Sequence, residues 1–82
     1  MAPLVLSGVR EGAVIKRLPG TARVMLALQT TGGEGRRWWF LNGESQTAAG
    51  ASVTLPLERP DRYQLVVMDE SGQVATANFT LQ

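Results

Sequence analysis

The sequence predicts an all-β fold, a sandwich or barrel built from about seven short strands. Pairs of turn-forming residues, such as Ser7-Gly8 and Asn42-Gly43, recur at short intervals along the 82 residues. The runs between them are short and rich in β-branched and aromatic residues, which favour strands. No window carries a sustained helical period. We therefore expect strands near residues 3–7, 13–17, 22–30, 36–41, 51–57, 62–69 and 73–81.

Each of the first three strands is followed by a turn that contains glycine. These turns are Ser7-Gly8, Pro19-Gly20 and Gly32-Gly33. The third turn belongs to the glycine-rich stretch TTGGEG, Thr30 to Gly35, which has no lysine after it and no following helix. It therefore lacks the features of a phosphate-binding loop, and we expect it to be a flexible hairpin tip.

The fourth strand, in the stretch GRRWWFLNGE, places three aromatic residues side by side. Because neighbouring side chains of a strand point to opposite faces, Trp38 and Phe40 share one face, and Trp39 and Leu41 share the other. We expect Trp39 and Leu41 to lie inside, although a shift of register by one residue would exchange the two faces. Asn42-Gly43 then forms a turn, since both residues tolerate a positive φ.

The last three strands show the alternation of a sheet with one buried face. Pro56 lacks a backbone N–H donor, which indicates an edge position or a strand end. The tip Asp69-Glu70-Ser71-Gly72 predicts a hairpin between the last two strands, because it has turn chemistry and Gly72 can adopt a positive φ. The apolar residues of the alternation are Val53, Leu55, Leu57, Tyr63, Leu65, Val67, Ala75, Ala77, Phe79 and Leu81.

The composition excludes several classes of function. The net charge is +1, which is too near balance to indicate a nucleic-acid partner or contact with an anionic membrane. Cysteine and histidine are both absent, so the chain has no thiol chemistry and lacks the commonest general base and metal ligand. The carboxylates are scattered, and the adjacent Asp69 and Glu70 diverge in an extended chain. We therefore expect no catalytic activity, no metal and no cofactor.

Two features indicate an immunoglobulin-like sandwich formed by one small domain. A tryptophan lies on the strand that occupies position C of that fold, and DRYQL, near the start of the sixth strand, is typical of a tyrosine corner. In this motif the Tyr63 hydroxyl bonds back to the backbone, two residues ahead of the position that antibody domains fill with cysteine. Here that position is Leu65, so an apolar contact replaces the disulfide.

The assembled pattern resembles the C-terminal domain of bifunctional (class A) penicillin-binding proteins of the 1C type. The resemblance runs from about Leu4 to Leu81 and rests on GAVIKRLPG, on WWFLNG and on RYQLVVMDESG. It implies that residues 1–82 are an accessory domain from the C-terminus of a larger protein. In that family the domain follows a membrane anchor, a glycosyltransferase domain and a transpeptidase domain, and it faces the periplasm. The serine motifs S-x-x-K, S-x-N and K-T-G are absent from this chain.

The resemblance implies a non-catalytic module for interdomain or protein–protein contact in cell-wall synthesis. Its expected partner is the transpeptidase domain of the same chain or another periplasmic protein, for which an α-macroglobulin-like protein is a candidate. The candidate interaction residues are Arg36, Arg37, Trp38 and Phe40. The residues expected to have structural roles are Trp39, Asn42, Gly43, Tyr63, Leu65, Asp69 and Gly72.

A carbohydrate-binding module is the alternative hypothesis, and it uses the same residues. An exposed tryptophan stacks on a sugar ring, while a guanidinium from Arg36 or Arg37 would take a carboxylate of peptidoglycan. The sequence leaves open which surface binds, which partner binds there and whether the domain is monomeric.

Overall fold

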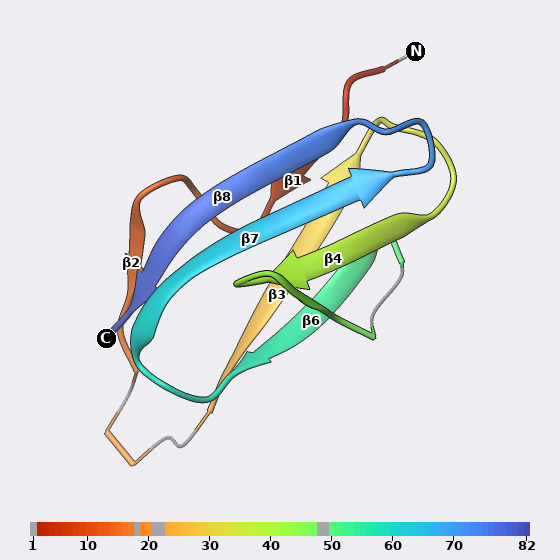
Figure 1. The fold of residues 1–82 in the computed structure, drawn as a ribbon. Helices are drawn as coiled ribbons and strands as arrows, with labels where there is room; N and C mark the ends of the chain where they lie inside the picture. Colours follow the sequence, from red (N-terminus) through yellow and green to blue (C-terminus); the bar gives the residue numbers. More distant parts are fainter. Residues whose placement is uncertain (1, 18, 21–22, 48–49) are drawn as a thin grey trace.

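Figure 1 shows the computed structural model, which describes residues 2–17, 19–20, 23–47 and 50–82. Within these residues the chain forms eight strands and no helix, so the expected all-β fold is confirmed. Seven strands overlap the predicted stretches, with β3 and β7 each extending one residue beyond the expected bounds, and the additional strand is β5, which has only two residues. The strands are β1 (Val5–Ser7), β2 (Ala13–Ile15), β3 (Val24–Thr31), β4 (Arg37–Leu41), β5 (Glu44–Ser45), β6 (Ser52–Leu57), β7 (Asp61–Asp69) and β8 (Val74–Leu81).

The strands form two sheets. One sheet has three strands in the order β1-β3-β6, and the other has five in the order β2-β8-β7-β4-β5. Neighbouring strands are antiparallel, except that β2 runs parallel to β8. Figure 1 shows β8, β7 and β4 in the front layer, with β3 and β6 behind them. The chain crosses between the layers after β1, β2, β3, β5 and β6, so its hairpins are β4–β5 and β7–β8.

The core lies between the two sheets and is filled by alternate residues of the strands. In β3 and β6, buried and exposed positions alternate strictly over most of each strand. Trp39 is the largest side chain that is fully buried. The buried apolar cluster consists of Leu4, Leu26, Leu28, Trp39, Val53, Leu55, Leu57, Leu65, Val67, Phe79 and Leu81.

The stretch Thr30 to Gly35 is not a hairpin tip, so that expectation is wrong. β3 pairs with β1 and β6, whereas β4 pairs with β5 and β7, and the loop between them therefore connects the two sheets. Gly32 and Gly35 have φ angles of 70° and 68°. A Cβ atom would collide with the Pro3 carbonyl oxygen at Gly32 and with the Glu70 side chain at Gly35. The glycines therefore permit close packing of this crossover against its neighbours.

Pro56 lies on the edge strand β6, where its missing N–H group does not interrupt pairing. Thr30 donates its backbone N–H to the Ala51 carbonyl oxygen at 2.7 Å. The even-numbered residues of β3 therefore point their N–H and C=O groups at β6, and the odd-numbered residues point theirs away. By that alternation Pro56, opposite Met25, turns its nitrogen away from β3. An edge strand tolerates proline in this orientation.

Candidate interaction face

The two tryptophans of β4 lie on opposite sides of the five-stranded sheet. Trp39 is 0% exposed and points between the sheets, where its Nε1–H group donates to the Gly50 carbonyl oxygen at 2.9 Å. Trp38 is 39% exposed and lies on the outer side. Leu41 shares the inner side with Trp39 and is half-buried at the margin of the core. The structure therefore commits the Trp39 indole to the core and leaves the Trp38 indole accessible.

Trp38 belongs to an apolar patch that crosses three strands. The strand register places it beside Met68 of β7, which lies beside Val74 of β8. In the next row Phe40 lies beside Val66. These five residues, Trp38, Phe40, Val66, Met68 and Val74, form what we call the aromatic face.

The aromatic face is continuous and half-exposed rather than a set of isolated apolar residues. Val74 is 54% exposed, and Phe40, Val66 and Met68 have intermediate exposure. The sequence pattern identified Trp38 and Phe40 but missed the other three residues. The available signal was the run LVVMD, in which both alternating sets of β7 are apolar until Asp69. A strand that is apolar on both sides indicates a second buried or partner-facing surface.

Polar residues surround this patch and come from the same strands. Gln64 and Asn78 form the next row across β7 and β8. Thr76 lies beside Val66, and both Thr76 and Arg36 are exposed. The arrangement is an apolar centre with a polar margin, which is the anatomy of a protein interface.

Arg37 is not available to a ligand, so its assignment as an interaction residue is wrong. The side chain is buried and shares the inner side of β4 with Trp39. Its Nε donates to Thr30 Oγ1 at 3.1 Å, and its two terminal nitrogens donate to the carbonyl oxygens of Gly35 and Gly32 at 2.6 Å each. The guanidinium therefore ties the crossover loop to β4, because it satisfies acceptors that would otherwise be buried without partners.

Asp69 has the same structural role at the end of β7. It is 1% exposed. Its Oδ1 accepts hydrogen bonds from the Ser71 hydroxyl at 2.7 Å, and from the backbone N–H groups of Gln73 at 2.9 Å and Ser71 at 3.0 Å. Its Oδ2 accepts from the Glu34 backbone N–H at 2.9 Å. Burial acts to raise the pKa of Asp69, but these hydrogen bonds outweigh it and hold the pKa below its usual range.

The beginning of the chain is attached to this same end of the sandwich. The Leu4 backbone N–H donates to Gln73 Oε1 at 3.1 Å, and the Gly33 N–H donates to the Ala2 carbonyl oxygen at 3.0 Å. Since Gln73 also donates to Asp69, the first residues share one hydrogen-bond network with the β7–β8 turn. The Trp38–Met68–Val74 row is the row of the aromatic face closest to this turn.

Asn42-Gly43 forms the turn of the β4–β5 hairpin. The φ angles are 50° at Asn42 and 81° at Gly43, as a type I′ turn requires. Asn42 also bridges to β7, because its Oδ1 accepts from the Gln64 N–H at 2.7 Å and its Nδ2 donates to the Arg62 carbonyl oxygen at 3.3 Å. The hairpin between β7 and β8 is also present, and Gly72 in its connection has a φ angle of 90°.

Tyr63 makes the hydrogen bond expected of a tyrosine corner. Its hydroxyl donates to the Arg59 carbonyl oxygen at 2.6 Å, and its ring stacks on Phe79 with 5.5 Å between the ring centres. Leu65, two residues further along β7, is 0% exposed. These residues fix the start of β7 and contribute no free polar group to the surface.

The buried polar side chains of the described residues serve the fold. Every buried side-chain nitrogen and oxygen among the described residues has a hydrogen-bond partner. No group of three or more carboxylates in residues 2–17, 19–20, 23–47 and 50–82 lies close enough to hold a metal ion. In the same residues, no helix is long and apolar enough to span a membrane. The aromatic face is a partly exposed apolar surface with a polar margin.

The described residues form a small all-β domain of two sheets. The Penicillin-Binding Protein C-terminus Family matches residues 1–79. Penicillin-binding protein 1C of Escherichia coli (strain K12) is 59% identical over 80 residues, which cover 98% of this chain and 10% of that protein. The chain therefore belongs to the penicillin-binding protein C-terminus family, and the resemblance found in its sequence is confirmed.

The chain spans about a tenth of the length of this relative, so the relative has many further residues outside the matched region. No solved structure matches the chain significantly.

Proposed function

We propose that this chain is a non-catalytic, immunoglobulin-like accessory domain that acts as an interaction module in cell-wall synthesis. The observation that carries the proposal is the aromatic face, an apolar surface with a polar margin on a domain whose buried polar groups all serve the fold. The parent protein would be a membrane-anchored peptidoglycan glycosyltransferase and transpeptidase, with this domain in the periplasm. Family membership supports this context.

The strand pairing supports an immunoglobulin-like assignment. The N-terminal segment is divided between the sheets, since β1 pairs with β3 while β2 pairs in parallel with the last strand, β8. The tryptophan on β4 packs in the centre of the sandwich, and Tyr63 forms a corner at the start of β7. This combination of a central tryptophan and a tyrosine corner is typical of immunoglobulin-like domains.

The position of the aromatic face favours docking within the parent chain. Residues 2–4 are bonded to the β7–β8 turn and the crossover loop, at the end of the sandwich where the Trp38 row lies. A domain that precedes residue 1 would therefore emerge next to this row. An apolar surface near a covalent link has a high effective concentration of its partner. The transpeptidase domain is the proposed partner, and an α-macroglobulin-like or other periplasmic protein is the alternative partner for the same face.

The test compares thermal melting of the isolated domain with melting of the same domain in the full-length parent. We expect the parent to stabilise the domain, because docking links binding to folding. Trp38→Ala should abolish most of this added stability while changing the isolated domain little. The matched control is Val14→Ala, since Val14 is 54% exposed on β2, at the far end of the same sheet. Equal melting behaviour of the two variants in the parent would refute docking through the aromatic face.

A carbohydrate-binding function is the second candidate, because the exposed Trp38 indole shares the outer face of the sheet with the hydroxyl and amide groups of Thr76, Gln64 and Asn78. The loss of Arg37 as a free cation removes part of its support. Tryptophan fluorescence distinguishes the candidates, since Trp38 is accessible and Trp39 is fully buried. Saturable quenching by soluble peptidoglycan fragments that disappears in Trp38→Phe would favour carbohydrate binding, and a flat titration would exclude it.

A further inference from the structure

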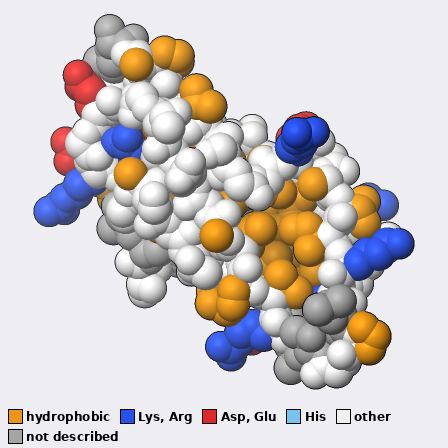
Figure 2. All heavy atoms as spheres, turned by 180° about the vertical axis from the view of Figure 1, so that it is seen from behind, with side chains coloured by type: hydrophobic (Ala, Val, Ile, Leu, Met, Phe, Trp, Pro, Cys, Tyr) orange, Lys and Arg blue, Asp and Glu red, His pale blue; other side chains and the backbone are white. Residues whose placement is uncertain are grey.

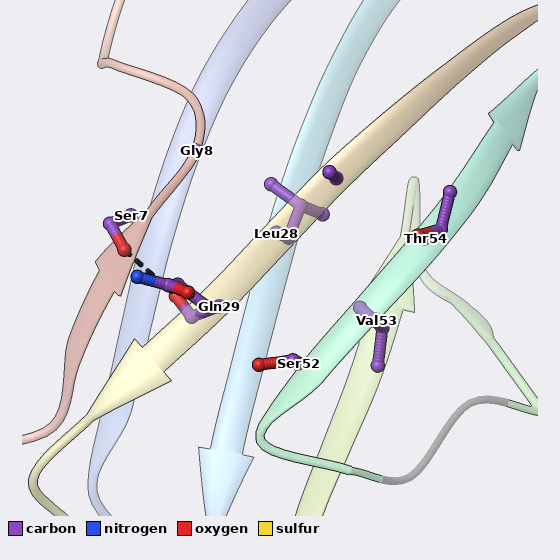
Figure 3. Close-up of a pocket in the computed structure, with 8 residues that line it drawn as sticks. Ser7, Gly8, Leu28, Gln29, Ser52, Val53 and Thr54 are labelled. Atoms are coloured by element: carbon purple, nitrogen blue, oxygen red, sulfur yellow. Dashed lines mark hydrogen bonds between the residues drawn. The ribbon is translucent and has the colours of Figure 1, made fainter.

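The three-stranded sheet has an incomplete edge on the side of β1. β1 pairs with β3 only from Val5–Thr31 to Ser7–Gln29, and the chain then turns away at Gly8 towards β2. Gly8 passes so close to Ala27 that a Cβ atom would collide with the Ala27 carbonyl oxygen. Figure 3 shows Gly8 at this departure point beside β3. Beyond this contact, residues 24–26 of β3 have a neighbour on the β6 side and no described strand on the opposite side, which we call the free edge.

The free edge offers backbone groups to an incoming strand. Because the Thr30 N–H points to β6, the backbone groups of odd-numbered residues in β3 point the other way. Gln29 and Thr31 are paired there with β1. Met25 and Ala27 turn their N–H and C=O groups to this side, where Gly8 covers the Ala27 carbonyl oxygen. No described residue hydrogen-bonds there to the two groups of Met25 or to the Ala27 N–H. An unpaired row of this kind is a template for another strand.

The side chains of the free edge and of the two residues after it lack the usual protection against pairing. The stretch VMLAL, residues 24–28, contains no charged residue and no proline. Leu26 and Leu28 point into the core, while Met25 is 56% exposed on the outer face and Ala27 is also exposed. Exposed edges are normally protected by lysine, proline or a bulge. An unprotected apolar edge is an aggregation hazard unless a partner covers it.

An apolar hollow lies along the segment that joins β1 to β2, and Gly8, which contacts β3 at Ala27, is part of its lining. It is lined by Leu6, Val9, Ala13 and Ile15, which pack against the core but remain half-buried, and by Arg10. Figure 2, a view from behind, shows apolar side chains gathered in this hollow, with Lys and Arg side chains around it. A strand added along β3 would direct alternate side chains into the hollow.

The charge around the hollow is positive. Arg10 lines it, and Lys16 and Arg17 directly follow Ile15. Glu11 is the one carboxylate between these cations in sequence, and its Oε1 is directed to β8, where it accepts hydrogen bonds from the backbone N–H of Asn78 at 3.0 Å and from its side chain at 3.3 Å. A second copy of this chain would bring the same cations against one another across the edge, which is unfavourable. An acidic partner is favoured instead.

From these observations we infer that the free edge and the apolar hollow bind an extended segment of another protein by β-strand addition. The segment would carry apolar residues at alternate positions to fill the hollow and acidic residues to meet Arg10, Lys16 and Arg17. Backbone hydrogen bonds to the N–H and C=O groups of Met25 and to the N–H group of Ala27 would hold it, as in other domains that add a peptide to a sheet edge. This surface is separate from the aromatic face, and the inference does not depend on docking there.

The test uses an extended peptide of about eight residues that alternates leucine with glutamate, and a control peptide that alternates leucine with lysine. The backbone amide signals of the 82-residue chain are followed by NMR during titration. We expect the acidic peptide to shift and protect the amides of Met25 and Ala27, with weaker binding at high salt. The basic peptide should bind at least about fivefold more weakly.

Two pairs of variants separate backbone pairing from side-chain contact. Met25→Pro removes the N–H group on the free side without touching the β6 ladder, since the opposite residue is already Pro56. It should abolish binding, whereas Met25→Ala should retain it. Arg10→Glu changes an exposed side chain and should weaken binding of the acidic peptide about fivefold. Arg36→Glu, which changes an exposed cation beside the aromatic face, should leave this binding unchanged. This second pair keeps the test decisive if Met25→Pro fails to fold.

Several results would overturn the inference. They are equal binding of the acidic and basic peptides, equal loss in Met25→Pro and Met25→Ala, amide shifts confined to the Trp38 region, and no shift at millimolar peptide. Self-association that protects Met25 without peptide would identify a second copy as the occupant and would also overturn it.

Discussion

Asp69 shows how a carboxylate that looks available in the sequence is used entirely by the fold. Both of its oxygens accept hydrogen bonds, and the donors come from the β7–β8 turn and from the crossover loop after β3. An ionised carboxylate is well suited to this place because it only accepts. Asp69 therefore fastens the β7–β8 turn to the loop that crosses between the two sheets, and its charge is part of the folded state.

The pH dependence of stability should report this role. The pKa of Asp69 is lower in the folded chain than in the unfolded chain. The ionised carboxylate therefore stabilises the fold at pH values above the unfolded pKa of about 3.9. The contribution is lost progressively as pH falls from about 4 through the folded pKa. Urea unfolding monitored between neutral and strongly acidic pH should show this decline. Asp69→Asn should melt lower at neutral pH, because its NH₂ group would face N–H donors, and should show a flatter acid profile. A variant as stable as the wild type would contradict the role.

Arg37 and its neighbour Arg36 provide a matched comparison of a buried and an exposed guanidinium. Arg37 donates to three separate acceptors around the crossover loop, and an ammonium group cannot reach all three from one position. We expect Arg37→Lys to lower the free energy of unfolding by about 2 kcal/mol. Arg36→Lys should change it by less than about 0.5 kcal/mol. Equal effects of the two substitutions in chemical denaturation would show that the loop does not depend on the guanidinium.

The sequence could not distinguish these two arginines. Adjacent residues of a strand point to opposite faces, so one of the pair had to point inward. Arginine is rarely buried, which made two exposed side chains the natural expectation. The burial of Arg37 depends on the carbonyl oxygens of Gly32 and Gly35, and these oxygens come together only once the loop has folded. Trp38 and Phe40 were identifiable because aromatic alternation is a local signal, whereas Met68 and Val74 joined them only through pairing between strands.

At the scale of the element, β4 divides its two tryptophans between stability and surface. Trp39→Phe removes part of a fully buried ring and the hydrogen bond to Gly50. It should lower the free energy of unfolding by about 2 kcal/mol, through a cavity and an unpaired carbonyl group. Trp38→Phe, on the outer side of the same strand, should cost less than about 0.5 kcal/mol. Denaturant unfolding of the isolated domain measures both, and similar losses would contradict the assignment of faces.

The strands themselves were predictable, but their arrangement in sheets was only partly so. Alternation located seven strands because burial of one face leaves a local period of about two residues. β5 was missed because two polar residues carry no such period. The crossover after β3 was mistaken for a hairpin tip because turn residues do not specify the partner of the next strand. β3 does not pair with the next strand, β4. Its partner is β6, which follows β4 and β5 in the sequence.

At the scale of the whole molecule, the two proposed surfaces use different parts of an elongated sandwich. Its Cα atoms extend over 43 × 23 × 19 Å. The aromatic face lies on the outer side of β4, β7 and β8, next to the beginning of the chain. The free edge and the apolar hollow lie on the other sheet and towards β2. A domain with this layout can hold its parent with one surface and a separate protein with the other.

The layout predicts that the two surfaces act independently, because substitutions at distant sites without shared partners are additive. Trp38→Ala should leave the affinity for the acidic peptide within about twofold of the wild type, and Met25→Pro should leave the stabilisation by the parent unchanged. The double variant should lose both properties by the sum of the single effects. Peptide titration and melting of the same full-length proteins measure the two quantities. If Trp38→Ala weakens peptide binding as strongly as Met25→Pro does, the surfaces are coupled through the core, and a single interface would have to replace the two described here.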